Sequence, residues 1–508
     1  MRTISRLHEL PTTGQVLIFG AGQGGQMVWR ALAKRPGVLV IGFIDNSKTG
    51  TMNGLPIHRP SDVLPPKAGV SVIIASMFAG AIAEDLRSFG VEDWYSAAPL
   101  IRNLIQAKQM RERPNPVFAA LGEMMLVLGA LVLAAVGRFS RKNIDVGIGP
   151  ECLINNKYHK KAVSHAGFSA ETYVIGVTHV TQEFDHVFMP ENISKQNIFI
   201  LLSAFWLAVT RYRILYMYFG GGPFYATRWA WRIEPLLFSI AGTRVVLLPY
   251  GQDIQDFTRC PNLIFKHATS VDYPFQSRDR KRIADRIDLW SRSADHVISG
   301  CDWVDYMYRW DTLIPGHFAI DVDELSGRVE KARNGAAGDD GRVRIMHAPN
   351  HRTIKGTRHI IAAVERLQDE GLPIDLIIVE AAANQTVLQR MAEADIVIDQ
   401  LVIGWYAMVA IEAMALGKPV ICFIRPDLHE LYVTTGSLAP DELPLVTASP
   451  ETLADALRPL VTDRERRRAL GARSQAYVRA RHSIETIGAV FGAINKELGV
   501  APSGAGIS

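Results

Sequence analysis

Glycines and one aspartate near the start of the chain form a pattern that could bind a nucleotide. An apolar run at 16–19 leads into Gly20-Ala21-Gly22-Gln23-Gly24-Gly25, and a helix-compatible stretch follows at 26–34. Glycine permits a tight turn and lets backbone N–H groups approach a pyrophosphate at the positive end of the following helix. Asp45 ends the next apolar run, where a carboxylate could accept hydrogen bonds from ribose hydroxyls. The alternative is a tight strand-to-helix turn without a ligand.

The amino-acid sequence around this loop resembles that of a known type of domain. VLIFGAGQGGQ, GFIDNS and NGLPIHRPSDV are similar to the small nucleotide-binding domains attached to bacterial polysaccharide-synthesis enzymes, including sugar epimerase-like and acyltransferase-associated types. Strand patterns at 38–44 and 70–75 and a helix near 79–88 predict a parallel βαβ sheet over residues 12–98. The region holds no Tyr-xxx-Lys pair for short-chain epimerase chemistry, which favours binding over catalysis. The ligand is either a dinucleotide such as NAD or a nucleotide sugar.

A second set of candidate residues lies in the last third of the chain. The segment IGWYAMVAIEAMALGKPVI resembles the closing signature of group 1 (family 4) glycosyltransferases of the GT-B fold, and residues 342–497 resemble their nucleotide-sugar-binding half. The resemblance implies that Glu412 holds the donor ribose, a role for an acceptor-only side chain fixed on a helix. It also implies that Lys355, in HAPNHRTIKG, stabilises the charge that develops on the departing nucleoside diphosphate.

Two positions depart from the pattern of this family. A family glutamate that contacts the transferred sugar, eight positions before Glu412, is Gly404 here, and the family arginine five residues before Lys355 is Asn350. Backbone N–H groups around Gly404 could serve the sugar, the donor could differ, or catalytic capacity could be reduced. Arg352 could supply the second cation from a shifted position. We therefore expect an atypical donor pocket.

Candidates on the opposite side of the cleft come from the middle of the chain. Gly147 and Gly149 could bring backbone N–H groups against the diphosphate. Tyr250-Gly251-Gln252-Asp253 resembles a loop on the acceptor side of the family, and Asp253 is the candidate there, with a turn- or helix-capping role as its alternative. We find no Asp-x-Asp in the context of a metal-dependent transferase, so no metal is expected. The resemblance implies retention of anomeric configuration.

Two facing α/β domains are needed to position these residues. Strand patterns at 143–149, 213–218, 245–248 and 295–299 define a domain over 143–325, and those in LPIDLIIVE, MAEADIVID and GKPVICF define another over 326–508. This is the GT-B arrangement, with the nucleotide sugar at the carboxyl ends of both sheets. A helix at 483–498 is expected to return to the first of these domains. With a Rossmann-like domain over 1–110, the predicted class is α/β throughout.

An apolar segment at 117–137, within a linker over 111–142, carries one charge, Glu123, and arginine-rich flanks. As a helix it would be about 30 Å long, enough to cross a bilayer. Crossing would separate the first domain from the transferase, and the next apolar run, at 198–209, is too short to cross back. We predict an interfacial or protein-buried helix, with a true span as the alternative. Trp229 and Trp231, beside two arginines, could lie at a headgroup boundary or on a core helix.

The totals bound the class of protein. Apolar residues are 48% of the 508 and charged residues 21%, which fits folded domains. The 55 basic and 51 acidic residues are too near balance to indicate nucleic-acid binding. Four dispersed cysteines without a CxxC pair predict reduced thiols in the cytoplasm and no structural zinc. The first twenty residues show no secretory signal pattern.

Together these patterns favour a cytoplasmic glycosyltransferase at the inner face of the plasma membrane. It would move a sugar from a nucleotide-sugar donor to a glycan or lipid-linked acceptor in bacterial surface polysaccharide synthesis, a pathway implied by resemblance, with no cofactor required for transfer. Two alternatives stay open. One is an NAD-dependent sugar-nucleotide oxidoreductase or epimerase working through the N-terminal domain; the other is a sugar-nucleotide-binding regulator without turnover.

Overall fold

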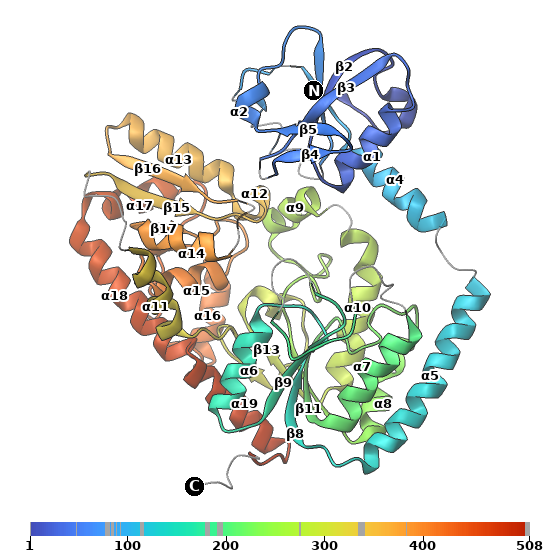
Figure 1. Ribbon diagram of the computed structural model, residues 1–508. Helices are drawn as coiled ribbons and strands as arrows, with labels where there is room; N and C mark the ends of the chain where they lie inside the picture. The colour runs from blue at the N-terminus through green and yellow to red at the C-terminus, as the bar shows by residue number, and fades with distance from the viewer. Residues whose placement is uncertain are drawn as a thin grey trace. The chain divides into compact units, whose positions relative to one another are not determined.

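The computed structural model describes residues 2–46, 48–76, 82, 86–87, 89–91, 93–111, 116–177, 183–189, 197–273, 276–333, 341–380, 382 and 384–502. They form two compact units, residues 1–119 (unit 1) and residues 120–508 (unit 2) (Figure 1). Most of the helix predicted near 79–88 lies outside the described residues. Unit 1 is built on one largely parallel sheet and unit 2 on two parallel sheets.

Unit 1 holds one seven-stranded sheet in the order β1-β7-β6-β2-β3-β5-β4, parallel except between β4 and β5. The strands are β1 Arg2–Thr3, β2 Gly14–Phe19, β3 Val38–Ile44, β4 Gly50–Met52, β5 Leu55–His58, β6 Val70–Ile74 and β7 Trp94–Ser96. Alternate residues of β2 enter different cores: Val16 and Ile18 pack with helices α1 (Gln23–Leu32) and α4 (Ala98–Arg111), whereas Leu17 and Phe19 face the other side. Burial on both faces explains why β2 reads as a continuous apolar run.

The first sheet of unit 2 has seven parallel strands in the order β10-β9-β8-β11-β12-β13-β14. They are β8 Ile144–Ile148, β9 Ala170–Val174, β10 His186–Val187, β11 Tyr212–Tyr218, β12 Arg244–Leu248, β13 His296–Ser299 and β14 Thr312–Leu313. One face packs on α6 (Asn155–His165) and α19 (Ile484–Glu497), the other on α7 (Ile198–Arg211), α8 (Glu234–Ala241) and α10 (Gln276–Ser293). The helix expected to return to this domain is α19, whose Phe491 packs in the same core as Val146.

The second sheet of unit 2 has four parallel strands in the order β16-β15-β17-β18. They are β15 Val343–His347, β16 Ile374–Ile378, β17 Ile396–Ile398 and β18 Val420–Ile421. The helices of this half are α11 Val322–Arg333, α12 Arg352–Lys355, α13 Thr357–Asp369, α14 Asn384–Glu393, α15 Met408–Ala415, α16 Pro426–Thr434, α17 Leu453–Thr462 and α18 Arg464–Arg481. The predicted class, a Rossmann-like domain followed by two more, is confirmed.

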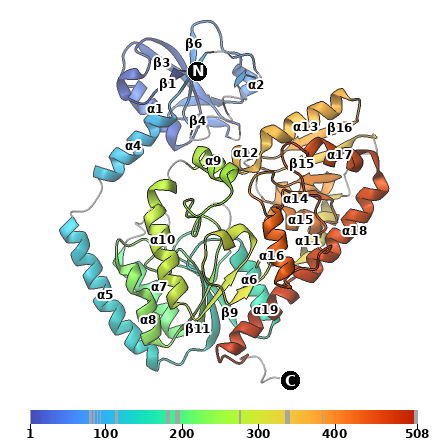
Figure 2. The ribbon, with the colours of Figure 1, turned by 180° about the vertical axis from the view of Figure 1, so that it is seen from behind.

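Helix α5 (Pro116–Phe139) carries the apolar segment. Among the described residues, Val117–Phe139 alone is long and apolar enough to cross a membrane, with mean hydropathy 2.3. The helix lies along α7 in both views (Figures 1 and 2), and Leu126 and Ala130 share a core with Leu201. A Cβ at Gly137 would lie 2.8 Å from a backbone oxygen of α7, so glycine permits this close packing.

The one charge of α5 is used inside unit 2. The Glu123 carboxylate accepts the backbone N–H groups of Arg228 (2.5 Å), Trp229 (2.8 Å) and Ala230 (3.1 Å) at the start of the 3-10 helix η2 (Ala230–Ile233). These donors have no partner within their own turn, so a carboxylate there stabilises the helix start. Glu123 therefore fastens α5 to the first domain of unit 2, and the opposite face of α5 remains exposed.

Candidate functional site

Lys355 and Asp399 form a buried ion pair at the carboxyl ends of β15 and β17. Lys355 ends α12, and its ammonium donates to Asp399 Oδ1 at 2.6 Å, with side-chain exposures of 9% and 0%. Asp399 follows β17 directly, and its other oxygen accepts the Ala407 N–H at 3.4 Å. An ammonium has three N–H donors, so this pair leaves donors for a phosphate.

Glu412 lies on α15 and is 6% exposed. The side-chain amide of Asn384, at the start of α14, donates to Glu412 Oε1 at 3.3 Å. Burial raises the pKa of Glu412 to about 7, and the nearby negative charge of Asp399 adds to the rise. Asp399 thus links the two predicted donor-site residues, since it bonds Lys355 and acts electrostatically on Glu412. The ribose role of Glu412 and the phosphate role of Lys355 remain predictions.

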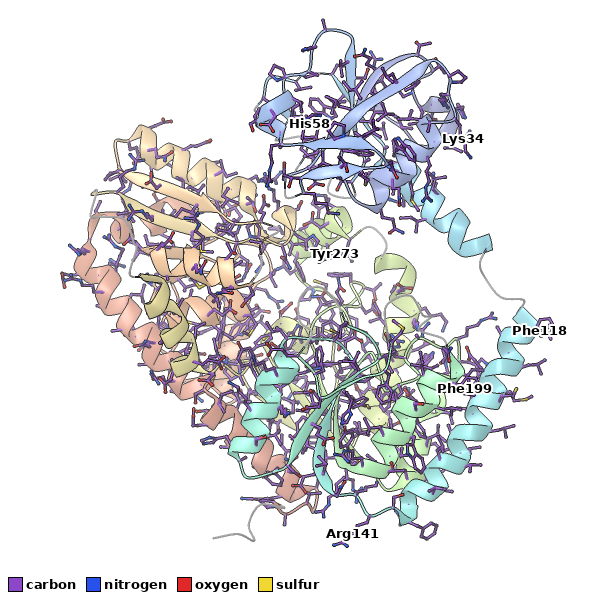
Figure 3. The ribbon with its side chains drawn as sticks, in the orientation of Figure 1. Lys34, His58, Phe118, Arg141, Phe199 and Tyr273 are labelled. Atoms are coloured by element: carbon purple, nitrogen blue, oxygen red, sulfur yellow. The ribbon has the colours of Figure 1, made fainter. Side chains whose placement is uncertain are left out.

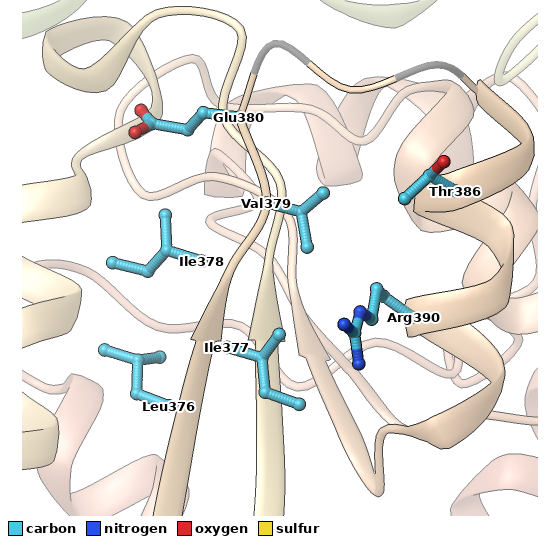
Figure 4. A pocket seen from close by; sticks show the side chains of 7 residues that line it. All are labelled: Leu376, Ile377, Ile378, Val379, Glu380, Thr386 and Arg390. Carbon is cyan, nitrogen blue, oxygen red and sulfur yellow. The ribbon is translucent and has the colours of Figure 1, made fainter. Parts of the chain in front are cut away.

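Arg352 forms an ion pair with Glu380. Its guanidinium donates to both Glu380 oxygens, at 2.9 and 2.7 Å, where Glu380 follows the end of β16. Glu380 also lines a groove along the edge strand β16, and Figure 4 shows Arg390 extending from α14 toward that strand. Asn350 is exposed just before α12. Arg352 therefore reaches a phosphate only in exchange for a bidentate carboxylate partner.

Gly404 occupies the place where the family pattern expects a glutamate. Its φ is +106°, and a Cβ there would lie 2.6 Å from Arg425 Cδ. The guanidinium of Arg425 bonds Asp305 of the first domain (2.5 Å) and Asp427 at the start of α16 (2.5 Å). An L side chain at 404 is excluded by both the backbone conformation and the arginine stem. The departure at this position is therefore built into the packing.

Gly147 lies inside β8, where its backbone pairs with β11 and β9. A Cβ there would lie 2.2 Å from the Tyr212 ring. The N–H of Gly149 donates to Tyr216 O at 3.1 Å, and a Cβ at 149 would lie 1.9 Å from Tyr173 O. These glycines admit neighbouring side chains and backbone. The Gly149 N–H is already used within the sheet, and the diphosphate role of the two glycines stays a prediction.

Asp253 is buried and accepts backbone hydrogen bonds from the loops that follow β11 and β12. One oxygen accepts the N–H groups of Tyr250 and Gly251 and the other accepts that of Phe219, each at 3.0 Å. Burial raises the pKa of this carboxyl to about 7, and the three backbone donors oppose the rise. The structure thus gives Asp253 the capping role that the sequence left open, at the carboxyl ends of β11 and β12.

Glu234, which the sequence analysis did not single out, accepts backbone N–H groups of the glycine-rich loop after β11. It begins α8, is fully buried, and accepts the N–H groups of Gly222 (3.0 Å) and Phe224 (2.7 Å). Burial raises the pKa of Glu234 to about 8. The apolar composition of the EPLLFSIA segment, with a single carboxylate at its start, was the available signal. Glu234 and Asp253 fix the shape of this end of the first sheet.

The two domains of unit 2 touch at several polar contacts besides Arg425. The Asp272 carboxylate, at the end of α9 (Leu263–Asp272), accepts the Ile354 N–H in α12 at 2.9 Å. The Tyr273 ring (Figure 3) lies 4.3 Å from that of His351 between centroids. Trp405 donates through its indole N–H to Pro315 O at 2.8 Å. The Asp272 carboxylate of the first domain therefore accepts the hydrogen bond of the Ile354 N–H, next to Lys355.

The glycine loop of unit 1 is held by close backbone packing and by hydrogen bonds to Asp45. Gly20 has φ +117°, and a Cβ at Gly25 would lie 1.9 Å from the Gly20 oxygen, so both must be glycine. The helix begins at Gln23, earlier than the predicted 26, with Gly22 as its N-cap and open space where a Cβ would stand. Asp45 accepts the N–H groups of Ala21 (2.8 Å) and Lys48 (2.9 Å). Asp45 thus holds the loop, and its ribose role stays a prediction.

Comparisons with known proteins find distant similarity to solved structures. No protein-family model and no curated protein matches the sequence. HepE from Anabaena, solved with UDP and glucose, has TM-score 0.45 and 16% identity over 70% of this chain and 100% of its own. Sucrose-phosphate synthase from Thermosynechococcus elongatus has TM-score 0.45 and 16% identity over 70% and 99%. A UDP-N-acetylglucosamine 2-epimerase has TM-score 0.40 and 13% identity over 71% and 97%. Similarity at this level assigns no activity to this chain.

Among the described residues no group of three or more His, Cys, Asp or Glu side chains is arranged to hold a metal ion. At the carboxyl ends of the second sheet, where the Arg352–Glu380 pair also lies, Lys355 supplies a cation and Asp399 and Glu412 supply two carboxylates. Such a set can bind a phosphate through the ammonium and a diol through a carboxylate oxygen.

Proposed function

We propose that unit 2 is a glycosyltransferase that takes a sugar from a nucleotide-sugar donor. The observation that carries the proposal is the cluster Lys355, Asp399 and Glu412 at the carboxyl ends of a parallel sheet, where open α/β sheets bind ligands. Lys355 would face the diphosphate. Glu412 Oε2, which has no hydrogen-bond partner among the described residues, would accept a ribose hydroxyl.

In this proposal the bond between the anomeric carbon and the β-phosphate oxygen breaks, and a bond to an acceptor hydroxyl oxygen forms. The acceptor proton leaves with the departing phosphate, whose charge Lys355 stabilises. Transfer on the same face of the sugar, without a metal, follows from the family resemblance stated above. The acceptor would be a glycan or a lipid-linked glycan of bacterial surface polysaccharide synthesis, reached from the inner face of the plasma membrane.

The test measures nucleoside diphosphate released from a panel of common nucleotide sugars, with extracted lipids as acceptors. We expect release from one donor class and its loss in Lys355→Ala and Glu412→Ala. The control is Glu430→Gln, an exposed glutamate on α16. Absence of release from every donor, with the protein folded, would end the transferase proposal.

A second candidate is a sugar-nucleotide-binding regulator without turnover, favoured by one observation. Arg425 fills the space at Gly404, so no carboxylate can stand where the family pattern places one for the sugar. The regulator would gain thermal stability from a nucleotide sugar yet release no diphosphate. Lys355→Ala would then weaken binding with no activity to lose.

Unit 1 is proposed to bind a nucleotide, either NAD or a nucleotide sugar. The support is Gly22, whose identity no neighbouring atom requires, at the N-cap of a helix whose first N–H groups favour an anion. The ammonium of Lys48 donates to Ala21 O at 3.1 Å and so lies at the same loop. Thermal melts with each ligand on wild type and Gly22→Val test this; equal shifts in both would refute it.

A further inference from the structure

Three guanidinium groups surround one buried indole in the first domain of unit 2. We call Arg232, Arg282 and Arg286 the arginine cluster. Their central carbons lie 4.3, 5.9 and 5.4 Å from the centre of the Trp231 ring. Arg282 and Arg286 stand one turn apart on α10 and therefore on one face of it, while Arg232 comes from η2.

Two of these guanidinium groups donate only to backbone carbonyls among the described residues. Arg282 and Arg286 each donate to Tyr225 O at 2.5 Å, and Arg282 also to Thr227 O at 2.7 Å. The Nε atoms of both are buried without an acceptor, and neither forms a salt bridge within the part of the chain that the structure describes. Two cations therefore converge on one carbonyl. Burial, with the neighbouring charge of Arg282, lowers the pKa of Arg286 to about 10.

The cluster adjoins the turn that fastens α5 and the loops at the carboxyl end of the first sheet. Next to Trp231, the backbone at 228–230 is held by Glu123 of α5. On its other side Arg286 interacts electrostatically with Glu234 and Tyr250, which shape the loops after β11 and β12. The cluster is therefore connected both to α5 and to the loops that follow β11 and β12.

The outer face of α5 is apolar. Met125, Leu128 and Val132 are 66%, 58% and 63% exposed and recur at helical spacing. On the neighbouring α7, Phe199 is 81% exposed (Figure 3). Side chains of this kind favour hydrocarbon over water by about 25 cal/mol for each Å² covered.

We propose that the arginine cluster binds the phosphate or diphosphate group of a lipid-borne acceptor whose hydrocarbon chain lies against the outer face of α5. Guanidinium forks match phosphate oxygens in pairs, and an anion there would accept the Nε–H groups of Arg282 and Arg286 that have no acceptor in the structure. The proposal names the acceptor class of the proposed transferase and rests on that function.

The test uses the full chain and vesicles of phosphatidylcholine containing a long-chain isoprenyl diphosphate. We expect wild type to bind them, and Arg282→Gln/Arg286→Gln to bind about tenfold or more weakly, because each lost charge-assisted hydrogen bond is worth that much. Arg292→Gln, on the same helix with its side chain on Asp288 O, is the matched control and should bind as wild type. Equal binding by the double variant and the control overturns the proposal.

Two further arms identify the source of the phosphate. Phosphatidylglycerol vesicles present a lipid phosphodiester, and inorganic pyrophosphate presents the free anion. Arginine-dependent binding of phosphatidylglycerol as strong as that of the isoprenyl diphosphate would mean a general anionic surface and would overturn the acceptor assignment. Competition by pyrophosphate that is lost in the double variant supports a defined anion site.

Folding and function are separated by two more measurements. Arg282→Lys/Arg286→Lys keeps both charges but loses the forks, so a folded lysine variant with binding between wild type and the glutamine variant supports the proposal. Thermal stabilisation by the nucleotide sugar should be unchanged in both double variants. If wild type binds the isoprenyl diphosphate through these arginines but no nucleotide sugar, the anion site stands and the transferase proposal fails. If nucleotide sugar displaces the isoprenyl diphosphate, the cluster belongs to the donor and the inference fails.

Discussion

Replacing Glu412 by glutamine should make the protein more stable at pH 8. The folded pKa of this carboxyl is about 7, against 4.5 for the ordinary side chain, mainly because it is buried. A carboxyl with a raised folded pKa binds its proton more tightly in the folded state, so stability is lost as the pH rises from about 4.5 through about 7. The difference corresponds to about 3 kcal/mol at about 1.4 kcal/mol per tenfold change in the proton-binding constant. Glutamine cannot ionise and keeps an oxygen for Asn384.

Urea unfolding of Glu412→Gln and wild type at pH 5, 6, 7 and 8 measures this. We expect the variant to gain about 3 kcal/mol at pH 8 and about 1 kcal/mol or less at pH 5. The exposed control, Glu430→Gln, should change the free energy of unfolding by about 0.5 kcal/mol or less at every pH. Nucleotide-sugar stabilisation should fall in Glu412→Gln alone. A variant that is less stable at pH 8, or equally stabilised at pH 5, would show that burial does not penalise this charge.

Three other substitutions follow from the packing. Gly404→Ala should cost about 2–4 kcal/mol in urea unfolding, since φ is +106° and a Cβ meets the Arg425 stem; an unchanged midpoint would contradict this. Lys355→Met should cost about 3–5 kcal/mol by leaving Asp399 buried without its cation, and Lys355→Met/Asp399→Asn should regain most of it; thermal melts that show no recovery would refute the pairing. Glu234→Ala should cost about 1–3 kcal/mol in urea unfolding by leaving the N–H groups of Gly222 and Phe224 buried without an acceptor; a stabilised variant would contradict the capping role.

The elements that sequence predicted well are those whose signal is local. β2, β3 and β6 are continuous apolar runs bounded by glycine or polar residues, so the parallel sheet of unit 1 follows from periodicity and length. The start of α1 was predicted three residues late, at 26, because Gly24 and Gly25 are poor helix formers. In the structure the helix nevertheless includes both glycines. Residue 25 must be glycine there, because a Cβ would strike the Gly20 oxygen.

The site depended on partners that no local pattern reveals. Asp399 follows a predicted strand, yet nothing in its neighbourhood shows that Lys355, 44 residues earlier, will pair with it. Asp305 meets Arg425 across 120 residues, and that pairing explains Gly404. In the sequence Glu123 is only the one charge of an apolar segment, yet it accepts hydrogen bonds from backbone N–H groups 105 to 107 residues away. Long-range hydrogen bonds of this kind are set by tertiary packing.

The return of α19 to the first sheet of unit 2 bears on how the chain is made. Tyr216, in the middle of that sheet, donates to Phe491 O, 275 residues further along. A ribosome adding about 5–20 residues per second takes roughly 14–55 s to cover that interval. Throughout that time one face of the sheet, with Val146 and Ile214, lacks α19, one of the two helices that bury it. The nascent chain therefore exposes an apolar surface long after the sheet can form, which makes it a substrate for holding chaperones during translation.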